Sequence, residues 1–209
     1  MDKKKKTAII LIVIIVLAAA VYFGVTYFLD KDLEEQEKEL EMLKQEQVET
    51  KSGKIIKTEL CNFEDGEFFV KIPVEFANMS QELMAQKYPS GNLPSYAFTN
   101  EDGTVNVVLN VTGDSMKDED IESFIKAVSA QAAGDPDKVK TSVYEKSGHK
   151  IGIVEMVTPA VDTDIYNKMA VFTVDGKMRI VSFNCTIQLQ EEWQPVGEFI
   201  IDSLHFPAE

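Results

Sequence analysis

The sequence predicts an α+β fold in which helices cover an antiparallel sheet, preceded by one transmembrane helix and a charged helical stalk. From residue 54 onward, short runs rich in β-branched and aromatic residues recur, and Asp-Gly or Ser-Gly pairs separate several of them. Two longer segments among these runs carry apolar residues at helical spacing. Strands joined by short turns, with helices between and after them, are typical of α+β domains. The 209 residues leave room for one such domain plus appendages.

The N-terminal apolar run predicts a membrane span. Residues 7–29 carry no charge over 23 positions, and a bilayer core needs about 20 apolar residues of helix. Lys3–Lys6 precede this run, whereas acidic residues follow it from Asp30 onward. Because lysines near a span stay in the cytoplasm, we expect residues 1–6 to form a cytoplasmic basic tail and the C-terminal part to lie outside the cell membrane.

A cleaved secretory signal is the alternative for the same segment. Ala18, Ala19 and Ala20 form a small-residue site of the kind at which signal peptides are cut. Apolar character nevertheless continues for nine residues beyond Ala20, and a released N-terminus would not need them. The single-pass anchor is therefore the prediction, and a secreted form cut near Ala20 is the alternative.

Residues 30–53 are predicted to form the charged helical stalk. Glu, Lys and Gln dominate this segment, and such a composition favours helix. Leu33, Leu40 and Leu43 fit the a and d positions of a coiled coil, although the segment holds only about three heptads. The pattern leaves two alternatives: a solvated single helix that ends at Ser52, and a weak dimer through the stalk.

Residues 54–209 are predicted to form the extracytoplasmic domain, which begins with two hairpins around a short helix. The Asp-Gly pairs at 65–66 and 102–103 predict the hairpin turns. The expected elements are strands over 54–61 and 67–72, a helix over 80–88 with Ser80 at its N-cap, and strands over 95–99 and 104–112.

The second half of the domain is predicted to be a four-stranded meander between two amphipathic helices. Short polar turns separate the strand candidates, as expected for consecutive antiparallel strands. The expected elements are a helix over 118–133, strands over 139–146, 150–161, 165–174 and 177–189, and a helix over 191–204.

Two short stretches resemble a known family. The first is Phe-Val-Lys-Ile-Pro-Val-Glu-Phe at 69–76, and the second is Ile-Ile-Asp-Ser-Leu-His-Phe at 200–206. Together with the order of elements from 54 to 206, they resemble the PsbP-like family, which includes membrane-attached bacterial relatives of the DcrB kind. The resemblance implies helices around an antiparallel sheet and a non-catalytic binding or assembly role. It implies no catalytic residue.

The sequence offers no catalytic, cofactor-binding or metal-ligating set. Its two histidines, His149 and His205, do not occur in any zinc-binding motif, and a zinc site needs three or four ligands. No phosphate-binding glycine loop or nucleophile motif is present. Starting an EF-hand at Asp162 would place Asn167 and Thr173 at its glycine and glutamate positions, so only weak calcium binding stays open. We therefore predict a protein that is not an enzyme and has no cofactor.

The charge balance restricts the partners of the outer part. Beyond the basic tail, 17 Lys and Arg face 34 Asp and Glu. Such an acidic surface repels phosphates, which excludes a nucleic-acid partner. Anionic wall polymers would also be repelled unless divalent cations bridged the two surfaces.

The two cysteines, Cys61 and Cys185, are candidates for a disulfide. Both would lie on the oxidising side of the membrane, where cysteine pairs tend to be bonded. Pairing requires Cα atoms closer than about 7 Å, and the sequence does not place their strands side by side. A disulfide and two separate apolar thiols both remain open.

The function predicted from the sequence is a single-pass, membrane-anchored extracytoplasmic module of the cell envelope that binds or assembles without catalysing a reaction. Its predicted partner is another envelope protein or a ligand. The alternative is a small-ligand sensor or enzyme accessory domain, with a site in the cleft between helix and sheet.

Overall fold

The computed structural model describes residues 27, 31, 33–34, 37–38, 40–88, 93–132 and 139–207, with the backbone alone at 131–132. The chain divides into two compact units, one ending at Gln45 and the other beginning at Glu46. The predicted span over 7–29 lies outside the described residues except for Tyr27. Within the described part, no helix is both long enough and apolar enough to cross a membrane.

The helix of the predicted stalk ends earlier than expected. Described residues are helical as far as Lys44, whereas the prediction continued the helix to Lys51. Instead, strand β1 (Gln47–Glu49) pairs antiparallel with β2 (Ile55–Phe63), and Val48 lies opposite Ile56 and packs against the core. Burial of Val48 outweighs the helix preference of its Glu and Gln neighbours, because propensity differences amount to only about 0.7 kcal/mol per residue.

A small three-stranded sheet, in the order β1-β2-β3, opens the globular unit. Strands β2 and β3 (Phe68–Pro73) form the predicted hairpin around the short 3₁₀ turn η1 (Glu64–Gly66). Glu64 and Asp65 adopt positive φ angles of 50° and 58° in this turn. The hairpin is confirmed, but it belongs to a sheet separate from the main one.

The main sheet has seven antiparallel strands in the order β4-β5-β6-β10-β9-β8-β7. The predicted meander is confirmed, because β7, β8, β9 and β10 are consecutive neighbours. A crossover then places β6 beside β10. The strands are β4 (Ala77–Asn78), β5 (Tyr96–Thr99), β6 (Val105–Ser115), β7 (Lys140–Lys146), β8 (His149–Thr158), β9 (Ile165–Val174) and β10 (Lys177–Thr186).

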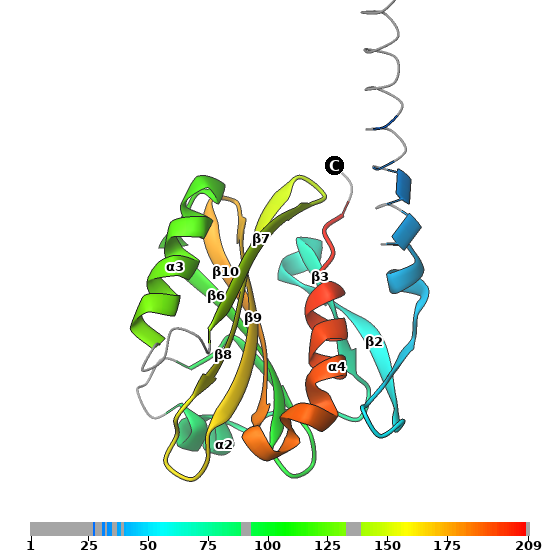
Figure 1. Ribbon diagram of the computed structural model, residues 1–209, viewed down its shortest axis with the longest axis vertical. Helices are drawn as coiled ribbons and strands as arrows, with labels where there is room; N and C mark the ends of the chain where they lie inside the picture. Colours follow the sequence, from blue (N-terminus) through cyan, green and yellow to red (C-terminus); the bar gives the residue numbers. More distant parts are fainter. Residues whose placement is uncertain are drawn as a thin grey trace, which may run out of the picture. The chain divides into compact units, whose positions relative to one another are not determined.

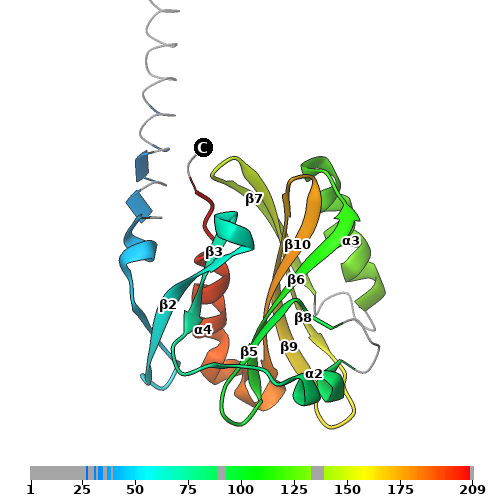
Figure 2. The same cartoon turned by 180° about the vertical axis from the view of Figure 1, so that it is seen from behind.

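Helices cover both faces of the main sheet (Figures 1 and 2). Helix α3 (Ile121–Ala132), entered through η2 (Asp118–Asp120), lies on one face, and α4 (Gln190–Asp202), entered through η4 (Ile187–Leu189), lies on the other face beside the small sheet. The α+β class with helices around an antiparallel sheet is therefore confirmed.

The short helix α2 (Gln81–Lys87) lies at one end of the main sheet, near the connection between β8 and β9 (Figures 1 and 2). It begins as predicted, because the Ser80 hydroxyl accepts a hydrogen bond from the Leu83 backbone N–H at 3.2 Å. Leu83 and Met84 pack against a small cluster that contains Val108 of β6. This packing holds α2 on the face of the sheet that also carries α3.

The largest core lies between the main sheet, the small sheet and α4. Alternate residues of β6, β8, β9 and β10 point into it, including Val105, Val107 and Leu109 of β6. A second cluster, with Val154 and Val171, lies under α3. Asn106 is therefore the first residue of β6 on the opposite face of the sheet, at the end near α2.

Candidate functional site

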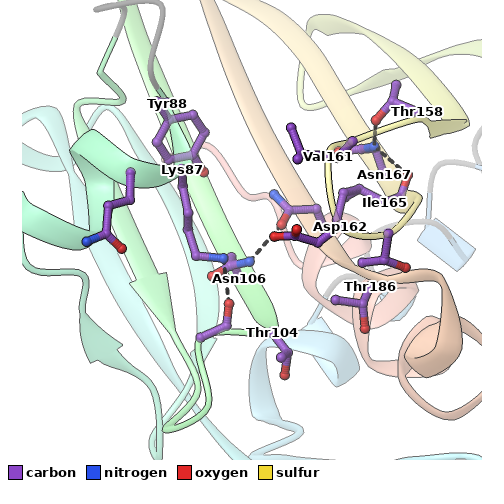
Figure 3. A pocket seen from close by; sticks show the side chains of 15 residues that line it. Lys87, Tyr88, Thr104, Asn106, Thr158, Val161, Asp162, Ile165, Asn167 and Thr186 are labelled. Carbon is purple, nitrogen blue, oxygen red and sulfur yellow. Dashed lines mark hydrogen bonds between the residues drawn. The ribbon is translucent and has the colours of Figure 1, made fainter.

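A pocket of about 640 Å³ opens at this end of the main sheet. Its first wall is the end of α2 with the turn between β5 and β6, and its second wall is the connection between β8 and β9. Figure 3 shows Lys87 and Tyr88 on one side, with Val161 and Ile165 on the other. The lining residues are Gln86, Lys87, Tyr88, Gly103, Thr104, Asn106, Thr158, Ala160, Val161, Asp162, Thr163, Ile165, Asn167, Asn184 and Thr186.

Three asparagines from adjacent strands form one row across the sheet at this pocket. Asn184 of β10 lies directly opposite Asn106 of β6 on one side and Asn167 of β9 on the other. The three, which we call the amide row, all line the pocket. Thr99 of β5 extends the line by one strand, because it pairs with Asn106.

A chain of hydrogen bonds orients the first part of the amide row. The Thr99 hydroxyl donates to Asn106 Oδ1 at 2.7 Å, and Asn106 Nδ2 donates to Asn184 Oδ1 at 2.8 Å. The Asn184 side chain hydrogen-bonds in turn to the Tyr88 hydroxyl. Asn106 is only 3% exposed, so its amide acts mainly to fix that of Asn184.

Asn167 is held from the other side of the pocket. Its Nδ2 donates to Thr158 Oγ1 and to the Ile165 carbonyl, both at 3.0 Å. Figure 3 shows these three residues together. Within the part of the chain that the structure describes, no donor reaches Asn167 Oδ1, so this oxygen is available to a ligand.

The ionisable residues of the lining are Lys87, Tyr88 and Asp162. Lys87 Nζ donates to the Gly103 carbonyl at 2.5 Å, and burial lowers the pKa of this amine. Burial raises the pKa of Tyr88, while the hydrogen bond with Asn184 lowers it in part. Tyr88 therefore stays neutral near pH 7, and among the described lining residues the formal charges of Lys87 and Asp162 cancel.

The residues singled out in the sequence lie elsewhere. Cys61 is half-buried on β2, Cys185 is fully buried on β10, and both are free thiols in the structure. Neither histidine lines the pocket: His149 stacks on Phe206 with ring centroids 3.9 Å apart, and the His205 backbone pairs with Phe69. His149 opens β8 and is half-buried.

Asp162, where the start of an EF-hand loop was considered, lies at the pocket. Among the described residues, no group of three or more His, Cys, Asp or Glu side chains is placed to hold a metal ion.

The sequence interpretation missed the amide row. Asn106, Asn167 and Asn184 each interrupt a predicted strand that is otherwise rich in apolar residues, and this was the available signal. The three asparagines are aligned only because β6, β10 and β9 are neighbours in this register. No local sequence pattern predicts the crossover that places β6 beside β10.

Neither the protein families nor the curated proteins searched contain a match to this chain. Among solved structures, the cyanobacterial PsbP protein of Synechocystis matches with a TM-score of 0.50 and 11% identity, covering 72% of this chain and 92% of that one. The fold is thus PsbP-like, as the resemblance implied.

Two further solved structures match with a lower TM-score. LpqN of Mycobacterium tuberculosis, described as involved in cell envelope biogenesis, has a TM-score of 0.45 and 10% identity, over 73% of this chain and 92% of that one. A protein of Bacteroides thetaiotaomicron has a TM-score of 0.45 and 15% identity, over 68% of this chain and 46% of that one.

Proposed function

We propose that the chain is a non-catalytic binding module of the cell envelope, anchored in the cell membrane by residues 7–29, with its folded domain outside. The observation that carries the proposal is the chemistry of the pocket. Nine of the fifteen described lining residues carry an amide or a hydroxyl, and the amine of Lys87 is engaged by a backbone carbonyl. Such groups orient a ligand, but they supply neither an activated nucleophile nor a paired acid and base.

The placement of the module rests on the charge pattern at its N-terminus. Lys3–Lys6 precede an uncharged run of 23 residues, and acidic residues follow it. This arrangement favours a cytoplasmic N-terminus and an external domain. The pocket favours the small-ligand form of the function over a module that binds only another protein, because it is concave and its size lies within the range of about 300–1,000 Å³ typical of ligand sites.

Topology and processing test this proposal in cells that produce the full chain. Protease added to intact cells should digest the domain after Asp30, while a cytoplasmic marker protein stays intact. Mass spectrometry of the mature protein should recover peptides from before Ala20 still joined to the rest. A domain protected from the protease, or a mature chain that begins at Val21, would contradict the anchored external module.

A charge variant provides the matched control for the anchor. Changing Lys3–Lys6 to glutamate removes the positive charge that holds the N-terminus inside, while the apolar run keeps its length. The protease-accessible fraction of the domain should fall in this variant. Unchanged accessibility would show that these lysines do not set the orientation.

A further inference from the structure

We propose that the pocket binds a short neutral saccharide, and that Asn184 and Asn167 of the amide row contact its ring hydroxyls. This inference rests on the proposed function, because it names the ligand class of the same binding module.

The amide row is a departure from the pattern of the strands that carry it. Asparagine is depleted in β-strands, yet three central strands each place one at the same level of the sheet. Farther along the same face, Val108 of β6 packs under α2 and Val171 of β9 packs under α3. Apolar residues at the row would extend these cores. Residues that oppose the strand preference without improving the packing are expected at functional sites.

The amides are held in place before any ligand arrives. Asn184 receives its hydrogen bond from Asn106, and Asn167 is fixed by Thr158 and Ile165. Groups that are already ordered lose little entropy on binding, so their hydrogen bonds contribute more to affinity. The row therefore forms a prepared polar surface and not a flexible set of side chains.

The lining matches hydroxyl groups in particular. An amide oxygen accepts and an amide N–H donates, and each hydroxyl of a sugar can do both. Both donors of Asn167 are engaged by Thr158 and Ile165, so Asn167 offers its oxygen to a ring hydroxyl. Threonine hydroxyls surround the row, and the Tyr88 ring and the fully exposed Val161 offer apolar surface for the C–H groups of a sugar ring. The threonines are Thr104, Thr158, Thr163 and Thr186.

The charge of the chain disfavours an anionic ligand, and the backbone pairing of the pocket floor disfavours a peptide. Lys87 and Asp162 balance formally within the pocket, and the acidic excess of 34 to 17 in the outer part disfavours an anionic ligand. A peptide usually adds to a sheet through its backbone, but β6, β10 and β9 are each paired on both sides. Their backbone groups at the pocket floor are therefore already used.

Binding of the full-length chain in lipid nanodiscs to an array of neutral oligosaccharides, uronic-acid oligosaccharides and short peptides tests the inference. We expect binding to neutral oligosaccharides. Asn184→Leu and Asn167→Val should each weaken that binding about 10-fold or more, because the ligand hydroxyls lose their partners. Asn110→Ala is the matched control: Asn110 lies on the same face of β6 outside the pocket lining, and its variant should bind as the unchanged chain does.

Folding is checked separately by thermal unfolding. Asn184→Leu removes the acceptor of Asn106 and can lower stability, whereas Asn167→Val places a strand-favouring residue at a half-buried site and should keep the unfolding temperature. Full binding by folded Asn167→Val and Asn184→Leu variants would overturn the inference, as would selective binding of peptides or uronic acids, or no binding to the array. None of these outcomes affects the protease accessibility that tests the anchored external module.

Discussion

Arg179 and Glu64 form a bidentate ion pair that joins the main sheet to the hairpin turn of the small sheet. Nη2 of Arg179 lies 2.9 Å from Glu64 Oε1, and its Nε donates to Glu64 Oε2. Nη1 donates to the carbonyls of Thr112 and Met178 at 3.1 and 3.0 Å. The two side chains are 7% and 21% exposed, so this pair is largely withdrawn from water.

Replacing Arg179 with alanine should lower the free energy of unfolding by about 2–3 kcal/mol. The change leaves the Glu64 carboxylate and two carbonyls without their donor, and the loss is smaller than the 3–5 kcal/mol of a fully buried pair because Glu64 is partly exposed. Arg179→Lys should recover only part of it, because an ammonium does not bind both oxygens in one plane. Denaturant unfolding followed by the fluorescence of the single tryptophan, Trp193, measures these differences.

A surface pair provides the control for this ion pair. Lys117 and Glu119 lie 3.4 Å apart with side chains 77% and 74% exposed. Lys117→Ala should change stability by no more than about 1 kcal/mol, since exposed pairs contribute little. Equal effects at Lys117 and Arg179 would contradict a structural role for the pair with Glu64.

Gly197 of α4 should not tolerate alanine. A Cβ atom there would lie 2.7 Å from Cε1 and 2.8 Å from Cγ of Phe183, whose ring fills the core beneath the helix. The clash should lower the free energy of unfolding by about 1–3 kcal/mol, although alanine in an open helix position would raise it by about 1 kcal/mol. Denaturant unfolding of the variant measures the sign.

Gly113 gives the matched comparison for Gly197. No atom lies within 4 Å of a Cβ built at Gly113, so Gly113→Ala should stay within about 0.5 kcal/mol of the unchanged chain. A stabilised Gly197→Ala variant would show that α4 does not pack as closely on β10 as the structure has it.

Local patterns in the sequence were sufficient to predict most elements of the domain. Alternation and turn residues predicted β9 at 165–174 with the bounds that the structure shows, and Ser80 marked the start of α2. These features depend on neighbours in the chain, so one sequence contains them. The strand β1 at 47–49 was missed because only its pairing with β2 makes a strand of residues that favour helix.

The candidate site depends on distant parts of the chain, and its residues were not predicted. Asn106 and Asn184 are 78 positions apart, and their hydrogen bond requires that β6 follow β10 in the sheet. The cleft between helix and sheet was predicted in general terms as a site for a small ligand. Its lining follows from register, which no periodicity in a single sequence specifies.

Stability should fall between about pH 9 and pH 12 because neutral thiol and phenol groups, Cys185 and Tyr144 among them, are buried. Burial raises the pKa of Cys185 from 9.0 to about 12, and burial together with Asp202 raises that of Tyr144 from 10.0 to about 12. Below their unfolded-state pKa values both groups are neutral in either state, and their stabilisation is fully present. As pH rises toward 12 the unfolded chain ionises first, so this stabilisation is lost.

Tyr144→Phe should make this alkaline loss less steep. The variant keeps the ring but removes the hydroxyl, so one of the ionisations that cause the loss disappears. Denaturant unfolding followed by circular dichroism at pH 8 and pH 11 gives the slope, and Tyr96→Phe serves as the control at a more exposed ring. Parallel pH profiles for the Tyr144→Phe variant and the unchanged chain would argue against burial of this hydroxyl.

The two cysteines should behave as free thiols of unequal reactivity. Cys61 is half-buried, and burial together with Glu59 raises its pKa, whereas Cys185 is fully buried with its pKa raised to about 12. The thiolate is the reactive form, so a thiol reagent at pH 8 should label Cys61 slowly in the folded protein and leave Cys185 unmodified.

Unfolding without reductant should expose two thiols per chain. Cys61→Ser assigns the slow label, because it should abolish labelling of the folded protein and leave one thiol after unfolding. No reactive thiol in the unfolded, unreduced chain would instead show the disulfide between Cys61 and Cys185 that the sequence left open.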